Sequence, residues 1–238
     1  MTSFSVPFIP GEIGLLKSIN GNHSAYWDAA MWLISNFASW VFPSIALLIF
    51  LFWKRPKSEA ILLLLAIGLC IAFGDLLSSH LAKPFFGRLR PTHTPWLEDE
   101  LHSVFGYKGH LYGFFSGHSA NYAAVATLLA LTFRNHLFSL LLFLLVGWVV
   151  YSRIYIGAHF PSDCLAGVII GGLVGLLVYR IYSGVRHNIL STGYRSSEKI
   201  FHEGIGFLNA ALFLTIPITL AFALELSLIH ISEPTRPY

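Results

Sequence analysis

The chain has 238 residues, of which 55% are hydrophobic and only 11% are charged. In soluble domains roughly a quarter of all residues are charged. This composition therefore excludes an ordinary soluble protein and indicates one that lies in a bilayer. A net charge of +3 is too small to suggest nucleic-acid binding, and no basic run is interleaved with aromatic residues. Cys70 and Cys164 lie in apolar stretches and form neither a zinc nor a disulfide pattern. We expect the bilayer as partner, no nucleic acid and no obligatory protein partner.

Apolar stretches recur along the chain. Residues 10–25 come first and mix apolar with polar residues, which is typical of an amphipathic helix in the membrane interface. A transmembrane helix needs about 20 predominantly apolar residues. Six later stretches meet or approach that length, namely 31–53, 59–79, 119–133, 137–156, 161–182 and 207–226. The sequence therefore predicts an all-α, polytopic membrane bundle with six transmembrane helices, which forms a single domain over residues 1–226.

The last residues, 227–238, differ in composition from everything before them. They read SLIHISEPTRPY and resemble a translated sequencing-adapter read-through, while a disordered polar tail is the alternative. We assign this tail no function, because either interpretation leaves the remainder of the chain intact.

Basic residues in the connecting loops predict the orientation of the bundle. Short cytoplasmic loops carry an excess of Lys and Arg. Eight of the fifteen basic residues fall on one side of the predicted spans, namely Lys54, Arg55, Lys57, Arg134, Arg180, Arg186, Arg195 and Lys199. Three of the seven on the other side belong to the motifs described next. We therefore expect those motifs to face the periplasm or another extracytoplasmic space.

Three short polar motifs stand at the ends of predicted spans. The first follows the second span, the second precedes the third, and the last lies between the fourth and the fifth. An antiparallel bundle places these three ends on one membrane face, where charged groups usually face a cavity or a partner. The motif residues are Lys83, Arg90, Pro91, Ser116, Gly117, His118, Ser152, Arg153, His159 and Asp163.

Each motif alone has an ordinary structural explanation. Lys83 and Arg90 suit a snorkelling helix end, and Ser116 suits a helix cap. A helix start after Ser-Gly also offers free backbone N–H groups to a phosphate. His159 and Asp163 suit a structural pair, but an Asp bonded to one imidazole nitrogen also leaves the other nitrogen free to attack.

Together the motifs resemble the signature of the type 2 phosphatidic acid phosphatase superfamily, whose relatives include vanadium haloperoxidases and glucose-6-phosphatase. The family pattern is Lys-x6-Arg-Pro, Pro-Ser-Gly-His and Ser-Arg-x5-His-x3-Asp, and the chain reads KPFFGRLRP, FSGH and SRIYIGAHFPSD. All three spacings match within residues 83–163. Phe115 takes the place of the usual proline, which we expect to affect the turn and not the chemistry.

The resemblance implies a lipid phosphatase of the bacterial plasma (inner) membrane that needs no metal or other cofactor. His159 is the implied nucleophile, which forms a phosphohistidine, and Asp163 orients it. His118 is the implied acid that protonates the leaving oxygen and then activates water. The implied phosphate-binding residues are Lys83, Arg90, Ser116, Gly117 and Arg153.

Other ionisable and aromatic residues receive no catalytic role. The run Glu98–Glu100 is more typical of a solvated face than of a two-metal site, because consecutive side chains diverge. Asp75 could position Lys83 or be a hydrogen-bonded buried carboxyl, and His80 is expected near the entrance. Aromatic residues between the first two motifs frame an entrance or belong to an ordinary interfacial belt; they are Trp96, Tyr107 and Tyr112.

The sequence leaves the substrate open among phosphatidic acid, phosphatidylglycerophosphate, undecaprenyl pyrophosphate and lipid A. Three other functions remain as alternatives: a lipid-linked phosphotransferase of the same superfamily, a transporter whose charges line an anion path, and a haloperoxidase, which would need bound vanadate. Release of inorganic phosphate without an acceptor separates the phosphatase from the phosphotransferase.

Overall fold

The computed structural model describes residues 7–36, 38–53, 56–189, 201 and 203–232. Within these residues the chain is helical and has no β-strand, only an isolated bridge between Leu89 and Tyr112. The α-helices are α1 (Glu12–Gly21), α2 (Ala25–Ser35), α3 (Ala38–Phe52), α4 (Lys57–Asp75), α5 (Lys83–Phe86), α6 (Gly117–Phe133), α7 (His136–Tyr155), α8 (Pro161–Ile189) and α10 (Ile205–Ser232). A π-helix, η1 (Leu76–Ala82), joins α4 to α5, and three 3-10 turns follow: η2 (Pro91–His93), η3 (Glu98–Glu100) and η4 (Val104–Gly106).

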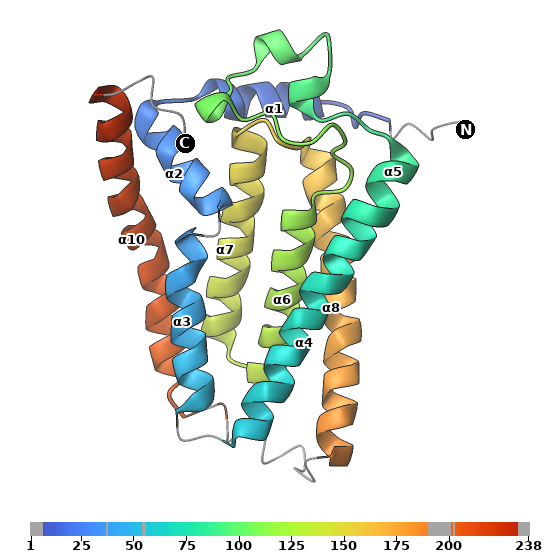
Figure 1. Ribbon diagram of the computed structural model, residues 1–238, viewed down its shortest axis with the longest axis vertical. Coiled ribbons are helices and arrows are strands. Elements are labelled where there is room, and N and C mark those ends of the chain that lie inside the picture. Colours follow the sequence, from blue (N-terminus) through green and yellow to red (C-terminus); the bar gives the residue numbers. More distant parts are fainter. Residues whose placement is uncertain (1–6, 37, 54–55, 190–200, 202, 233–238) are drawn as a thin grey trace.

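The long helices run alongside one another and form a membrane bundle (Figure 1). Five helices in the described part of the chain are long and apolar enough to cross a membrane: Ala25–Phe52, Lys57–Phe86, His136–Tyr155, Pro161–Asn188 and Ile205–Ile229. The predicted all-α membrane fold is therefore confirmed. The predicted span at 119–133 corresponds to α6, which has 17 residues and falls short of the usual spanning length. The predicted number of six spans is accordingly not confirmed.

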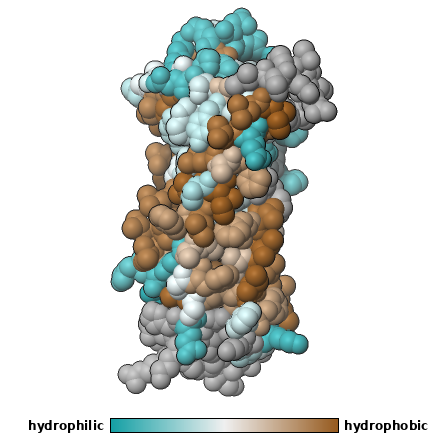
Figure 2. Space-filling model, turned by 90° about the vertical axis from the view of Figure 1, so that its left-hand side faces the viewer, coloured by the Kyte–Doolittle hydropathy of each residue, from teal (hydrophilic) through white to brown (hydrophobic). Residues whose placement is uncertain are grey.

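Apolar side chains cover the outside of this bundle. Leu65, Leu173 and Phe213 are each more than 60% exposed, which is the arrangement expected where the surrounding solvent is lipid. Figure 2 shows mostly hydrophobic residues across the middle of one face and hydrophilic residues mainly toward its two ends. The protein is a multi-pass membrane protein.

Helix α1 lies across one end of the bundle, over α7 and α8 (Figure 1). Leu16 is fully buried on its inner side, whereas Leu15 is 51% exposed. This crosswise amphipathic helix corresponds to the interfacial segment predicted at 10–25. The loop from Gly87 to Ser116 covers the same end, and we call this the motif end of the bundle because all three polar motifs lie there.

Close packing of α8 against α6 holds two of the motifs together. Gly167, Gly171 and Gly175 recur every fourth residue of α8 and face α6. A Cβ atom at Gly171 would lie 2.2 Å from the backbone oxygen of Ala120. Only glycine allows this approach, which is typical of small-residue contacts between membrane helices. The helix start that carries His118 is thereby fixed beside the start of α8.

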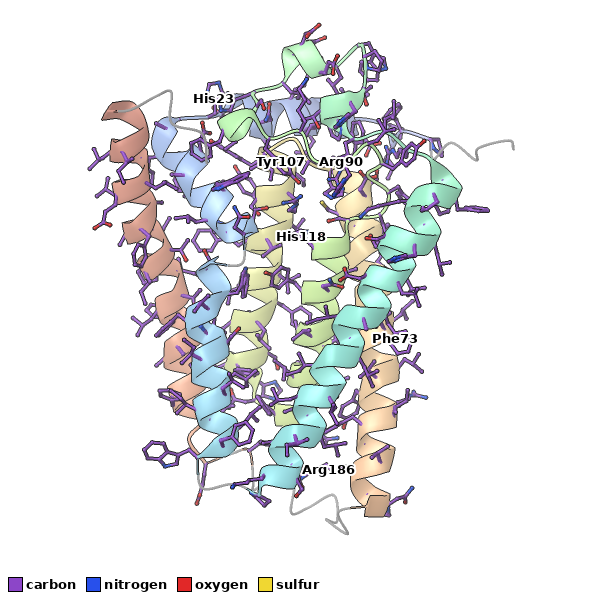
Figure 3. All side chains as sticks on the ribbon, viewed as in Figure 1. His23, Phe73, Arg90, Tyr107, His118 and Arg186 are labelled. Atoms are coloured by element: carbon purple, nitrogen blue, oxygen red, sulfur yellow. The ribbon has the colours of Figure 1, made fainter. Side chains whose placement is uncertain are left out.

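The opposite end carries a buried ion pair. Arg186 near the end of α8 donates from Nε and Nη2 to the two carboxylate oxygens of Glu59, at 2.6 and 2.9 Å. Figure 3 shows Arg186 far from Arg90 and His118, at the other end of the bundle. Four of the basic residues used to predict orientation lie outside the described residues: Lys54, Arg55, Arg195 and Lys199.

The composition change at Ser227 does not end a helix. Helix α10 continues to Ser232. Residues 233–238 of the predicted tail lie outside the described residues.

Candidate active site

The three motifs meet around a cavity of about 710 Å³. Figure 3 shows Arg90, Tyr107 and His118 near one another at the motif end. The motif residues in its wall are Lys83, Arg90, Gly117, His118, Arg153 and His159. These residues come from five separate segments, so the convergence predicted for an antiparallel bundle is found in the structure.

The turn that carries His159 begins with a glycine. Gly157 has φ +67°, a conformation that favours glycine. Its N–H donates to the Ile154 carbonyl at 3.0 Å, and the Ala158 N–H donates to the Arg153 carbonyl at 3.0 Å. This pair of bonds is the Schellman arrangement, which ends α7 within one turn. His159 consequently lies just beyond the helix end and faces the cavity.

Asp163 is fixed by the start of α8. Its Oδ2 accepts the Phe160 N–H at 3.0 Å, which is half of a capping box, and Pro161 occupies the first helical position. Its Oδ2 also lies 3.6 Å from His159 Nδ1. The predicted pair is therefore in place, although this distance is longer than a hydrogen bond.

Arg90 determines which nitrogen of His159 is available. Its Nη1 lies 2.8 Å from the Ala158 carbonyl oxygen and 3.0 Å from His159 Nε2. A guanidinium nitrogen only donates, so Nε2 is the acceptor and the proton of the neutral ring sits on Nδ1. The N–H then points to the Asp163 side, and the lone pair lies on the cavity side.

The surroundings of His159 favour this neutral ring. Burial lowers its pKa well below 6.5, and the cations of Arg90, Arg153 and Lys83 lower it further. The ring is only 1% exposed. The His159 ring is therefore uncharged at neutral pH.

Arg153 reaches the cavity from the last turn of α7. Its Nη1 donates to the Ser35 hydroxyl and its Nη2 donates to the Tyr107 hydroxyl at 3.2 Å. Its Nε has no hydrogen-bond partner among the described residues although it is buried. A buried N–H group without a partner is suited to bind an anion that enters the cavity. Of the three predicted entrance aromatics, Tyr107 alone lines the cavity.

The Ser-Gly-His motif forms the start of α6. Ser116 Oγ accepts the Ser119 N–H at 3.3 Å, so this side chain caps the helix. Ser116 is fully buried and is not among the residues that line the cavity. Gly117 and His118 do line the cavity, and the first-turn N–H groups of α6 have no partner within the helix.

Lys83 lies at the end of the π-helix η1. Its Nζ is 3.4 Å from Ser79 Oγ, and both residues line the cavity together with Asp75. Asp75 Oδ1 accepts a hydrogen bond from Asn121 at 2.9 Å. Asp75 is thus hydrogen-bonded but exposed rather than buried, and it lines the same cavity as Lys83. His80 does not line the cavity.

A buried network behind the motifs was missed by sequence reasoning. Arg88 donates from Nη1 to Asp163 Oδ1 at 2.6 Å and from Nη2 to Glu12 Oε1 at 2.7 Å. Ser162 also donates to Glu12. Although burial raises the pKa of Glu12, the hydrogen bonds and the nearby Arg88 lower it overall. The position of Arg88 within the first motif was the only feature of the sequence that indicated this network. Glu12 lies 76 residues away in the chain, and nothing in the sequence linked it to the motifs.

The chain is similar to known proteins over most of its length. The model of the PAP2 superfamily matches residues 59–186. The chain is 37% identical over 218 residues to the lipid A 4'-phosphatase of Porphyromonas gingivalis, a match that covers 87% of this chain and 92% of that protein. It is 36% identical over 202 residues to the lipid A 4'-phosphatase of Bacteroides thetaiotaomicron, which covers 80% and 89%. The crystal structure of Aquifex aeolicus LpxE is similar with a TM-score of 0.56 and 29% identity, and the match covers 74% of this chain and 99% of that one.

The family match includes every residue of the three motifs. It also spans the helices from α4 to α8, which hold those motifs around one cavity. The sequence relatives extend the similarity over most of the chain. The chain therefore belongs to the PAP2 superfamily and is a membrane lipid phosphatase, which hydrolyses phosphoric esters.

Proposed function

We propose that this phosphatase removes a phosphate from a lipid A-type glycolipid, with the 4'-phosphate as its target. The cavity is the observation that carries the proposal, because its charged end continues into an apolar interior. The two relatives that match most of the chain and are named lipid A 4'-phosphatases support the choice of lipid and position.

The apolar part of the cavity suits an acyl chain of such a lipid. Its wall includes Ile71, Val125, Leu129, Leu142 and Leu212, which come from four helices. The lining residues of α6 extend from Gly117 to Leu129. At 1.5 Å per residue this stretch covers roughly 18 Å. One acyl chain lies in this interior while the phosphate stays at the motif end.

His118 takes up its proton together with the substrate. Burial and the cations of Arg153, Arg90 and Lys83 lower the pKa of His118 to about 3. The charge of the anionic phosphate favours the imidazolium, so His118 becomes protonated as the phosphate binds.

Hydrolysis proceeds in two displacements at phosphorus. His159 Nε2 then attacks, a P–N bond forms, and the ester P–O bond breaks as His118 gives that proton to the leaving oxygen. The phosphorylated ring is positively charged, and the Asp163 carboxylate stabilises it. His118 then takes a proton from water, whose oxygen attacks phosphorus and breaks the P–N bond, so that inorganic phosphate leaves and His159 is restored.

Cations of the protein stabilise the charge that develops on the phosphoryl oxygens. Lys83, Arg90 and Arg153 supply three positive charges around His159, and the Gly117 N–H adds a donor. An incoming phosphate takes the Arg90 donor that now faces His159 Nε2, which frees the lone pair for attack. These cations take the place of magnesium, so turnover persists in excess EDTA.

The motif end of the bundle faces the periplasm in the bacterial inner membrane. The basic residues at the opposite end support this orientation, since Lys57, Arg134 and Arg186 lie there. A lipid phosphate at the outer leaflet would then meet the cavity without crossing the membrane.

A substrate panel tests the proposal. Purified full-length protein is incubated in EDTA with lipid A carrying both phosphates, phosphatidic acid, phosphatidylglycerophosphate and undecaprenyl pyrophosphate, and released phosphate is measured. Mass spectrometry of the lipid A product identifies the phosphate that is lost. We expect lipid A to be the best substrate and to lose the 4'-phosphate without any added acceptor.

Two variants control the assay. His159→Ala should have no turnover, whereas Asp163→Asn should keep a reduced rate, because orientation is impaired but the nucleophile remains. Parental turnover in His159→Ala would remove His159 from the mechanism. Loss of the 1-phosphate, or faster release from another lipid, would contradict the proposed substrate, and loss of activity in EDTA that magnesium restores would contradict metal-independent hydrolysis.

A further inference from the structure

Two histidines and a carboxylate meet at the motif end, outside the active site. His23 lies between α1 and α2, Asp28 lies in the first turn of α2, and His102 follows η3. The atoms that these side chains offer to a metal all lie within 4.8 Å of one another. Figure 3 shows His23 at the same end of the bundle as Arg90. We call these three residues the His-Asp-His cluster.

Neighbouring residues hold two members of the His-Asp-His cluster in place. The His102 N–H donates to Asn20 Oδ1 at 2.8 Å, and Asn20 Nδ2 donates to the carbonyl oxygens of His102 and Tyr155. The Tyr155 hydroxyl donates to Asp28 Oδ1 at 2.8 Å, and the other oxygen, Oδ2, lies 2.7 Å from His102 Nε2. Such outer contacts orient the ligands of protein metal sites.

His23, the third residue of the His-Asp-His cluster, adds a second imidazole on the solvent side. The ring centroids of His23 and His102 are 3.7 Å apart and the rings are nearly parallel. His23 is exposed, whereas the Asp28 side chain is only 12% exposed. An ion lies in the plane of each imidazole that binds it, so the exposed His23 ring must turn out of this stack when an ion binds, whereas Asp28 and His102 are anchored in the fold.

We propose that His23, Asp28 and His102 bind a Zn²⁺ ion. Two imidazoles and one carboxylate are a common zinc ligand set, in which water takes the fourth position. Imidazole nitrogen favours Zn²⁺ over Mg²⁺ and Ca²⁺, which prefer oxygen ligands. The ion has a structural role here, because the reacting groups of the active site belong to other segments.

Zinc would join two segments that both contact Arg153. Helix α2 carries Asp28 and also Ser35, whose hydroxyl accepts from Arg153. The segment after η3 carries His102 and also Tyr107, whose hydroxyl is the second acceptor. An ion bound to the His-Asp-His cluster thus links the two partners of a phosphate-binding side chain.

Zinc titration of the full-length protein tests this proposal. The protein is purified without a polyhistidine tag, stripped with a chelator, and titrated with Zn²⁺ against a chromophoric competitor. We expect one equivalent to bind and the melting temperature to rise. Because His23 is exposed, His23→Ala should fold normally and bind Zn²⁺ at least tenfold more weakly, and Tyr155→Phe should lose about 10- to 100-fold.

Matched controls separate this site from other histidines. His136→Ala removes an exposed histidine at the opposite end of the bundle and should bind Zn²⁺ like the parent, and Mg²⁺ should not raise the melting temperature. Absence of stoichiometric binding, or parental affinity in both His23→Ala and His102→Ala, would overturn the proposal. Lipid hydrolysis in EDTA is read separately, so failure of the proposed function would leave the zinc titration interpretable.

Discussion

At the scale of single residues, the hydrogen bond from Arg90 to His159 Nε2 sets the state of the histidine ring. The arginine fixes the tautomer, and burial keeps the ring uncharged. In the proposed mechanism, the same contact shields the His159 lone pair until an anion replaces His159 as the partner of Arg90. Binding of the substrate and activation of the proposed nucleophile are then one event.

The lowered pKa of His159 predicts a pH effect on stability. An unfolded histidine titrates near 6.5, whereas the native ring binds a proton only at lower pH. Between the two values the unfolded state binds more protons, so the free energy of unfolding decreases as pH falls through about 6.5. Melting temperatures of the parent and His159→Gln, measured between about pH 8 and pH 5, should converge as pH falls. Parallel curves would contradict the lowered pKa.

The network of Arg88 predicts a large loss of stability on mutation. Arg88→Met leaves the buried Asp163 and Glu12 carboxylates without their cation, which costs about 3 to 5 kcal/mol in the free energy of unfolding. Glu12→Gln in the same background should recover part of this loss, because one carboxylate becomes neutral. Chemical denaturation measures the free energy of unfolding of the single and the double variant. Lys17→Ala is the control, since its exposed pair with Glu100 is worth at most about 1 kcal/mol.

At the scale of helices, the packing of α6 against α8 sets the distances within the site. His118 lies in the first turn of α6 and Asp163 in the first turn of α8, so a change in the separation of the two helices would change the distance between these residues. Glycines make this contact close because the α6 backbone itself is the partner surface.

Gly171 provides a test of this close contact. Gly171→Ala places a methyl group against the backbone oxygen of Ala120, and overpacking of this kind costs about 1 to 3 kcal/mol. Gly172→Ala is the matched control, because its nearest contact would be an ordinary 3.9 Å to Thr127. Thermal unfolding should show a lower melting temperature for Gly171→Ala alone. Equal melting temperatures would mean that the helices can separate freely.

The helices and the motif residues of the cavity could be predicted from the sequence. The residues that hold those motif residues in place could not. Hydropathy predicts spans because every backbone polar group in lipid must be satisfied within a helix. Motif spacing predicts Lys83, Arg90 and His159 because the chemistry requires those groups. Glu12 and Ser35 were not predicted, since their roles arise from contacts with segments more than 70 residues away. Ser116 was predicted to bind the phosphate; its oxygen accepts the Ser119 N–H as a helix cap, and its role toward the phosphate stays a prediction.

At the scale of the whole molecule, one cavity links the charged motif end to the apolar interior. Its size follows from the spacing of α3, α4, α6, α7 and α10, all of which contribute to the wall. In the proposed function, the phosphate and the lipid chain therefore bind in different parts of this one cavity.

A larger side chain in the apolar interior should impair binding of the lipid chain and leave binding of the phosphate unchanged. Val125→Phe should raise KM for a long-chain lipid phosphate by about tenfold or more, because losing two buried CH₂ groups costs about 0.8 kcal/mol each. Hydrolysis of a water-soluble aryl phosphate should be unchanged. Leu173→Phe, at a position that is 62% exposed on the outer surface, should behave like the parent with both substrates. Equal effects of Val125→Phe on both substrates would contradict the assigned chain position.

The same cavity affects how the enzyme behaves once it leaves the bilayer. Extraction surrounds the protein with detergent, and an alkyl detergent is itself a polar head on one apolar chain. Detergent monomers therefore compete with the lipid for the interior. We expect the apparent KM to rise with free detergent concentration and with alkyl chain length, and to be lowest when the protein is returned to a lipid nanodisc.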